Sequence, residues 1–260
     1  MLAFKTIVGK DLREIFASRS IWLPMIALPL AGSILLPLIM LLAARHGFTG
    51  LATLEILLKQ APPDVRLATA SQKLLFIGLN RVVPMIFLFI PILTTCNLGS
   101  VSLAGERQGK TLETLLYSPL GIRHLYLAKL AGTFAVAYAI TLVCFLCFAV
   151  TASAGTWFRY GFSYLAFPQW LALILWLCPI VISLALGVIV SISARASSVQ
   201  SAMQLSSLMV VPIFFLLLSQ TAGSLALGPS RIFGLGAALL AAGAIVLWRV
   251  LAGLDVERLI

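Results

Sequence analysis

Long apolar segments alternate with short charged ones along the whole chain. Each apolar segment has about 19–25 residues, the length that an α-helix needs to cross the hydrocarbon core of a bilayer. The pattern predicts six membrane-spanning helices, at about 21–44, 82–104, 130–153, 169–193, 202–220 and 231–251. We therefore expect an all-α integral membrane protein in which residues 1–260 form a single transmembrane domain.

Residues 2–18 predict an amphipathic helix outside the spans. One side of this helix carries Phe4, Ile7, Val8, Leu12, Ile15 and Phe16, and the other side carries the charged residues. Because the segment precedes a span, we expect it to lie in the inner headgroup region of the membrane.

Two segments are expected on the outer side. Residues 45–81 mix charged and apolar positions around Pro62 and Pro63, and they predict two short helices on the outer surface. Residues 155–168 are rich in aromatic side chains and predict a short loop at the interface, where tryptophan and tyrosine are enriched.

The charged segment 105–129, between the second and third spans, predicts a short helix in water. Leucines recur at helical spacing at Leu112, Leu115 and Leu116, Thr111 is a suitable N-cap, and Pro119 would end the helix. The charged positions of the segment are Glu106, Arg107, Lys110, Glu113, Arg123 and Lys129. From the residues alone, docking on a partner and resting on the membrane interface are about equally good interpretations.

Composition supports the membrane class. The chain is 61% hydrophobic and 10% charged, whereas soluble domains average about 25% charged residues, and no polar stretch is long enough for a soluble catalytic domain. The net charge of +10 does not indicate a nucleic-acid partner, since the basic residues are scattered at span ends. With both termini inside, eleven of the 18 lysines and arginines face the cytoplasm, as the positive-inside rule requires.

Catalytic and metal-binding chemistry is not indicated. His46 and His124 stand alone, and the C-x-x-C pair Cys144 and Cys147 lies within an apolar span, away from the water and basic groups that activate thiols. The Gly105–Thr111 stretch resembles a phosphate-binding loop, but its glycines are one residue too close and a membrane span precedes it. We expect no catalytic residue, metal site or cofactor on this chain.

Polar residues within the spans are few. Those at mid-depth of the second span and in the fifth span are Thr94, Thr95, Asn97, Gln204 and Ser207. Such residues usually join helices through hydrogen bonds and less often contact cargo. We retain them as candidates for a substrate path.

The segment 105–129 resembles the first cytoplasmic loop of ABC-2-type exporter permeases. The matching residues are Glu106-Arg107, Lys110 to Glu113, Leu115-Leu116 and Ser118-Pro119. Two positions depart from the family pattern, because Lys110 and Ala128 stand where glycine is usual.

The resemblance implies a coupling helix that seats on a separate ABC ATPase subunit. The implied docking residues are Glu106, Arg107, Lys110, Thr111, Leu112, Glu113, Leu115 and Leu116. It also implies a complex of two permease copies with two ATPase subunits, in which ATP and magnesium bind only to the ATPase. We expect the chain to cross the bacterial plasma membrane several times, with both termini in the cytoplasm. Membrane lipid is then a further partner of the spans.

We therefore expect a transport subunit without enzymatic activity of its own, which exports an amphipathic or hydrophobic substrate such as a drug, a peptide or a lipid-like molecule. An ATP-driven sodium efflux permease of the same family is the alternative. An ion-coupled secondary transporter is a weaker one, because the spans hold almost no carboxylates.

Overall fold

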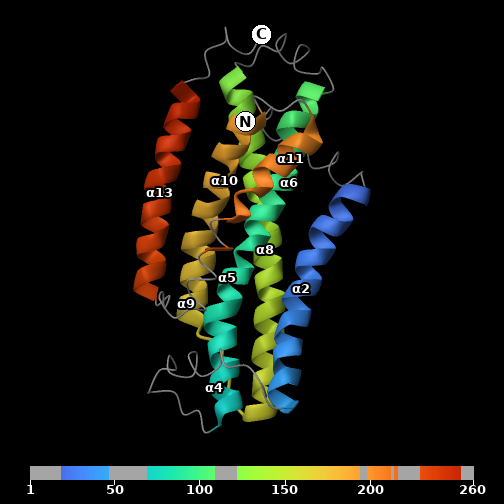
Figure 1. The fold of residues 1–260 in the computed structure, drawn as a ribbon, viewed down its shortest axis with the longest axis vertical. Coiled ribbons are helices and arrows are strands. Elements are labelled where there is room, and N and C mark those ends of the chain that lie inside the picture. The colour runs from blue at the N-terminus through green and yellow to red at the C-terminus, as the bar shows by residue number, and fades with distance from the viewer. Residues whose placement is uncertain are drawn as a thin grey trace.

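A computed structural model describes residues 19–46, 69–108, 122–193, 198–211, 214–215 and 229–252 (Figure 1). All regular structure in these ranges is helical. The α-helices are α2 (Arg19–His46), α4 (Ala70–Ile77), α5 (Val83–Phe87), α6 (Phe89–Gln108), α8 (Ile122–Tyr160), α9 (Phe167–Ala172), α10 (Cys178–Ser193), α11 (Val199–Ser207) and α13 (Pro229–Ala252). Two π-helical turns, η1 (Gly78–Val82) and η2 (Leu173–Leu177), continue the helices that flank them.

Four helical stretches of the described ranges are long and apolar enough to cross a membrane. They are Ile26–Arg45, Ala70–Ser102, Leu127–Tyr160 and Phe167–Ile192. They confirm an all-helical membrane protein with several passes. The interfacial helix that the sequence predicts at 2–18 lies outside the described residues.

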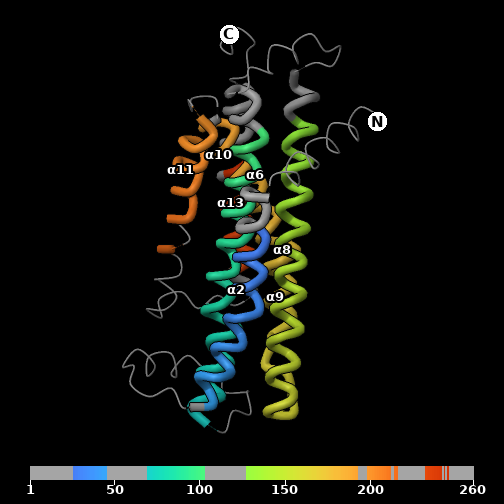
Figure 2. Tube along the Cα trace, turned by 90° about the vertical axis from the view of Figure 1, so that its right-hand side faces the viewer, coloured from blue at the N-terminus to red at the C-terminus, as the bar shows by residue number. Residues whose placement is uncertain are grey.

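The helices form an elongated bundle in which successive segments run in alternating directions (Figures 1 and 2). Helix α6 packs against α8, α10 and α11, while α2 packs on α8 and α13 packs on α10. We call the end where α6 finishes and α8 begins the loop end. The end where α8 finishes and α9 begins is the opposite end.

The second span begins earlier than the sequence predicts. From Ala70 to Gln108 the helices α4, η1, α5 and α6 follow one another, so the prediction of surface helices is wrong for residues 70–81. Thr69 starts this run with a capping box, in which its hydroxyl accepts from the N–H of Gln72. A helix much longer than the roughly 30 Å hydrocarbon core can hold charged residues beyond the core, so the charges of this segment do not end it.

The third span is also longer than expected. Helix α8 has 39 residues, which is roughly 58 Å at about 1.5 Å per residue, and it continues through much of the segment expected to be an aromatic loop. It ends at Gly161, whose φ of +78° is one that residues with a side chain rarely adopt. The connection to α9 is therefore short, at residues 161–166.

The fifth apolar segment is not a single helix within the described residues. Helix α11 ends at Ser207, and the N–H of Val211 then donates to the carbonyl of Leu208 at 3.0 Å in a tighter turn. In an α-helix that carbonyl would accept from residue 212, which is a proline without an N–H. The predicted fourth span agrees closely with Phe167–Ser193. Helix α13 covers the sixth apolar segment, but its described apolar part, Ile232–Ala241, is shorter than a span, so the sixth span stays a prediction.

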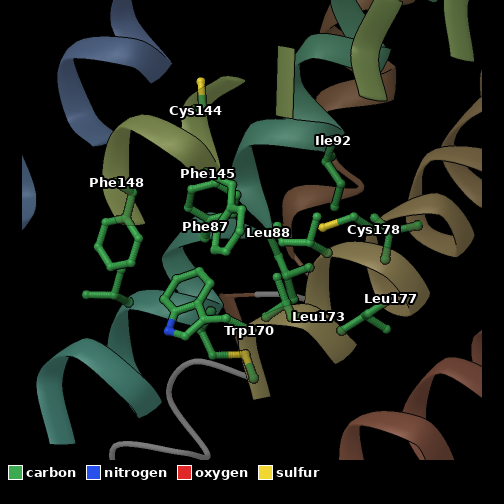
Figure 3. Close-up of a cluster of buried hydrophobic side chains, with 14 of the residues drawn as sticks. Phe87, Leu88, Ile92, Cys144, Phe145, Phe148, Trp170, Leu173, Leu177 and Cys178 are labelled. Carbon is green, nitrogen blue, oxygen red and sulfur yellow. The ribbon is translucent and has the colours of Figure 1, made fainter. Parts of the chain in front are cut away.

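Aromatic side chains fill the core near the opposite end (Figure 3). Trp170 of α9 is fully buried, and its ring centroid lies 4.6 Å from Phe148, 5.5 Å from Phe87 and 5.6 Å from Phe145. These partners come from α5 and α8. The cluster therefore joins three successive segments of the bundle, and offset and edge-on aromatic contacts of this kind add to the free energy of apolar burial.

Candidate functional site

Two of the eight predicted docking residues lie in the described residues, at the loop end of the bundle. Glu106 and Arg107 belong to the last turn of α6, so this part of the segment 105–129 is helical and continuous with the second span. Residues 122–129 likewise belong to α8. The remaining docking residues, Lys110, Thr111, Leu112, Glu113, Leu115 and Leu116, lie outside the described residues. The docking helix itself stays a prediction, while the helices that flank it in the sequence, α6 and α8, pack against each other.

Lys129 lies where these two helices meet. Its Nζ donates to the carbonyl oxygen of Ser102 on α6 at 3.4 Å, and the side chain is only 5% exposed. Ala128, beside it on α8, is buried as well. The sequence suggested a cytoplasmic charge at this position, whereas the structure places the lysine between the helices.

The two threonines of the predicted substrate path are buried within the bundle. Thr94 donates its hydroxyl to the carbonyl of Ile90 at 2.7 Å, and Thr95 donates to the carbonyl of Pro91. Both acceptors belong to the same helical segment. Their hydroxyls are therefore satisfied locally, a common arrangement for serine and threonine in membrane helices.

The other path candidates lie on α6 and α11, which pack together. Asn97 is half-buried on α6, while Gln204 and Ser207 are exposed on α11. The thiol of Cys96 donates to the carbonyl of Ser206 at 3.3 Å and so joins the two helices. We call this contact region the α6–α11 seam.

Two fully buried serines of α6 and α11 have hydroxyls without a hydrogen-bond partner among the described residues. They belong to Ser100 on α6 and Ser206 on α11, and both side chains are 0% exposed. A buried hydroxyl without a hydrogen bond is unfavourable by about 1–3 kcal/mol. Each of the two helices that meet in the seam therefore carries a buried polar group of this kind.

Asn80 is a structural centre that sequence reasoning missed. Its Nδ2 donates to the carbonyls of Tyr164 at 2.7 Å and Phe76 at 2.9 Å, and its Oδ1 accepts from the N–H of Ala166 at 2.7 Å. Its own carbonyl accepts from the side chain of Gln169. This amide thus binds the 161–166 connection to η1. The available signal was an asparagine in an otherwise apolar run, at a π-helical turn.

The aromatic ring of Tyr164 packs the 161–166 connection against the end of α8. The side chain is 2% exposed and lies against Tyr160, with ring centroids 5.2 Å apart. Burial raises the pKa of the Tyr164 phenol, and neighbouring Tyr160 adds a smaller effect in the same direction. The ring therefore stays uncharged, and the connection is held by neutral hydrogen bonds.

Within the described ranges, no group of three or more histidine, cysteine, aspartate or glutamate side chains could hold a metal ion. The four cysteines are free thiols, of which Cys147 is half-buried and the others are buried. Three features of the described residues stand out. Helices α6 and α8 pack against each other, and α6 meets α11 in the α6–α11 seam. At the opposite end, hydrogen bonds of Asn80 hold the 161–166 connection.

A family model described as ABC-2 family transporter protein matches residues 5–247 of the chain. No significant match was found among curated proteins or among solved structures. The family match covers most of the chain, including both helices that flank the docking segment and both helices of the seam. The chain therefore belongs to the ABC-2 family of multi-pass membrane proteins, the permease subunits of ABC transporters that work with a separate ATPase subunit.

Proposed function

We propose that this permease exports an amphipathic or hydrophobic molecule, such as a drug, a peptide or a lipid-like compound, from a bacterial cell across the plasma membrane. The working complex contains two permease copies and two ATPase subunits, and ATP and magnesium bind to the ATPase. Each permease is one domain of six spans with an interfacial helix at 2–18 and both termini in the cytoplasm. The alternating directions of the helices support this topology (Figure 1).

The observation that carries the proposal is the packing of α6 against α8, the two helices that flank the docking segment in the sequence. Both helices continue beyond their spans toward the segment, and they pack against each other before they reach it. A partner that pushes on residues 109–121 would therefore move two spans directly. Leu112, Leu115 and Leu116 would supply apolar contact area, and Glu106, Arg107, Lys110 and Glu113 would pair with charges of the ATPase.

The substrate path that we propose follows the α6–α11 seam. Asn97, Gln204 and Ser207 are the candidates that are at least partly exposed there. The hydroxyls of Thr94 and Thr95 are already bonded to carbonyls of α6, so we expect these two residues to affect the path only through the shape of the helix and not by binding substrate. Apolar side chains are exposed beside these polar ones, with Leu205 of α11 at 48% and Leu208, which follows the end of α11, at 62%. Alternating polar and apolar contacts of this kind suit an amphipathic cargo better than a fully polar one.

The test is transport by inside-out membrane vesicles that contain the permease and its ATPase, with a fluorescent amphipathic dye as the probe. We expect ATP-dependent accumulation of the dye, and a strong reduction when Gln204 and Ser207 are both replaced by leucine. Dye that does not accumulate, together with ATP-dependent accumulation of radioactive sodium, would instead identify a sodium efflux permease. Accumulation driven by an ion gradient without ATP would contradict the proposal altogether.

A further inference from the structure

Among the residues whose side-chain burial is described, Lys129 is the one charged residue that is buried. Lysine is almost never fully buried unless its ammonium group has a partner. Here the ammonium donates to the carbonyl oxygen of Ser102, a residue 27 positions earlier in the sequence. The contact therefore connects α8 to α6.

The contact lies close to the docking segment. Ser102 is six residues before the end of α6 at Gln108, and Lys129 is seven residues after the start of α8 at Ile122. Each distance is about two helical turns, or roughly 10 Å. The lysine thus joins the two helices just inside the point where they leave the bundle for the docking segment.

Two simpler explanations account for a lysine here less well. A lysine near the end of a span often extends its ammonium to the lipid headgroups, but that would leave the side chain on the outside of the bundle. Close packing alone would favour an apolar side chain of similar length, since an ammonium group loses hydration when it is buried. The 5% exposure and the bond to a carbonyl of the neighbouring helix favour a specific link between α6 and α8.

We propose that Lys129 is a positioning residue for coupling, which holds the loop ends of α6 and α8 together so that a force on the docking segment moves both helices as one unit. This inference rests on the proposed function of that segment. Without the link, α6 and α8 could separate when the segment is pushed. The ATPase would then still bind, but less of its motion would reach the spans.

The first measurement follows the link itself. Spin labels are attached at Gln108 and at Leu127, which is 53% exposed on α8, in a background whose native cysteines are replaced by alanine. We expect Lys129→Met to broaden the distance distribution between the labels, and Lys129→Arg, which keeps a charged donor, to leave it narrow. Lys73→Met, the same change at a half-buried lysine of the opposite end, is the control. An unchanged distribution in Lys129→Met would overturn the inference whatever the ATPase does.

The second measurement follows coupling in the complex with the ATPase. We expect Lys129→Met to retain co-purification of the ATPase but to lower substrate-stimulated ATP hydrolysis by roughly 2- to 30-fold, the range that changes along coupling networks produce. Full stimulation despite a broadened distance distribution would overturn the role in coupling. A wild-type chain that fails to bind the ATPase would instead refute the proposed function, while the label distances still report on the link. If Lys129→Met does not insert into the membrane, Lys129→Ala, which also removes the donor, gives the same comparison.

Discussion

The two ends of the α6–α8 pair are held together in different ways. At the opposite end, the neutral amide of Asn80 binds backbone groups of the 161–166 connection, and the Trp170 cluster packs beside it. At the loop end, the ammonium group of Lys129 on α8 donates to the carbonyl of Ser102 on α6. Several bonds from a short neutral amide to backbone groups fix one geometry, whereas the long, flexible side chain of a lysine permits small relative motion of the helices that it joins.

The difference between the Asn80 bonds and the Lys129 bond matches the roles that we propose for the two ends. The opposite end keeps three successive segments in register, so it stabilises the fold. The loop end receives force from the ATPase and must transmit it, so it needs a link that survives displacement. Changes at the opposite end should therefore affect stability, and changes at the loop end should affect assembly and coupling.

The largest effect is expected from the docking leucines. Replacing Leu115 and Leu116 together by aspartate should separate the permease from its ATPase, because about 2–4 kcal/mol of apolar burial is lost. Co-purification with a tagged ATPase measures this. Phe158→Asp, at an 89% exposed position of the opposite end, is the control and should retain the ATPase. If the ATPase co-purified fully with the double variant, the docking surface would have to lie elsewhere on the permease.

A similar or smaller effect, on stability alone, is expected from Asn80→Leu. This change leaves the N–H of Ala166 and the carbonyl of Tyr164 without their partner, and each buried group of this kind costs about 1–3 kcal/mol. Thermal unfolding in detergent should show a clearly lowered Tm, with the ATPase still bound below that temperature. The matched change Asn97→Leu, at a half-buried asparagine of α6, should lower Tm less. Equal Tm values for both variants would remove the special role of Asn80.

The smallest effect is expected from Thr94→Val. Its hydroxyl bonds only to carbonyls of its own helical segment, at 2.7 Å and 3.1 Å, and valine has nearly the same shape. The free energy of unfolding should change by no more than about 0.5 kcal/mol. If Thr94→Val lowered the stability as much as Asn80→Leu does, the Thr94 hydroxyl would have to join two helices. Polar groups bonded within one helix would then not differ from those that bridge two segments.

The sequence predicted spans better than it predicted helix ends. Hydropathy reports the part of a helix that suits hydrocarbon, so it located the fourth span at 169–193, close to the observed Phe167–Ser193. It placed the third span at 130–153, although α8 covers Ile122–Tyr160. Hydropathy reports where residues are apolar and does not report where the helical conformation ends. The same reason explains the missed start of the second span at Ala70.

The candidate site shows a second limit of sequence reasoning. The partners of Asn80 lie 84–89 residues away along the chain, so no local pattern reveals them. Lys129 resembles any charged residue at the end of a span until its neighbour on α6 is known. The docking residues were inferred from a resemblance to the family to which the chain belongs, and nothing in the described structure tests their role. Their contacts with an ATPase stay a prediction.

The most direct test of the account is site-specific photo-crosslinking from the two ends of the bundle. A photoreactive amino acid placed at Leu115, in the docking segment, should form a crosslinked product with the ATPase in intact membranes. The same amino acid at Phe158, which is 89% exposed at the opposite end, should form none. A crosslink to the ATPase from Phe158, or its absence at Leu115 in a complex that hydrolyses ATP, would contradict the claim that force enters this permease through the loop between α6 and α8.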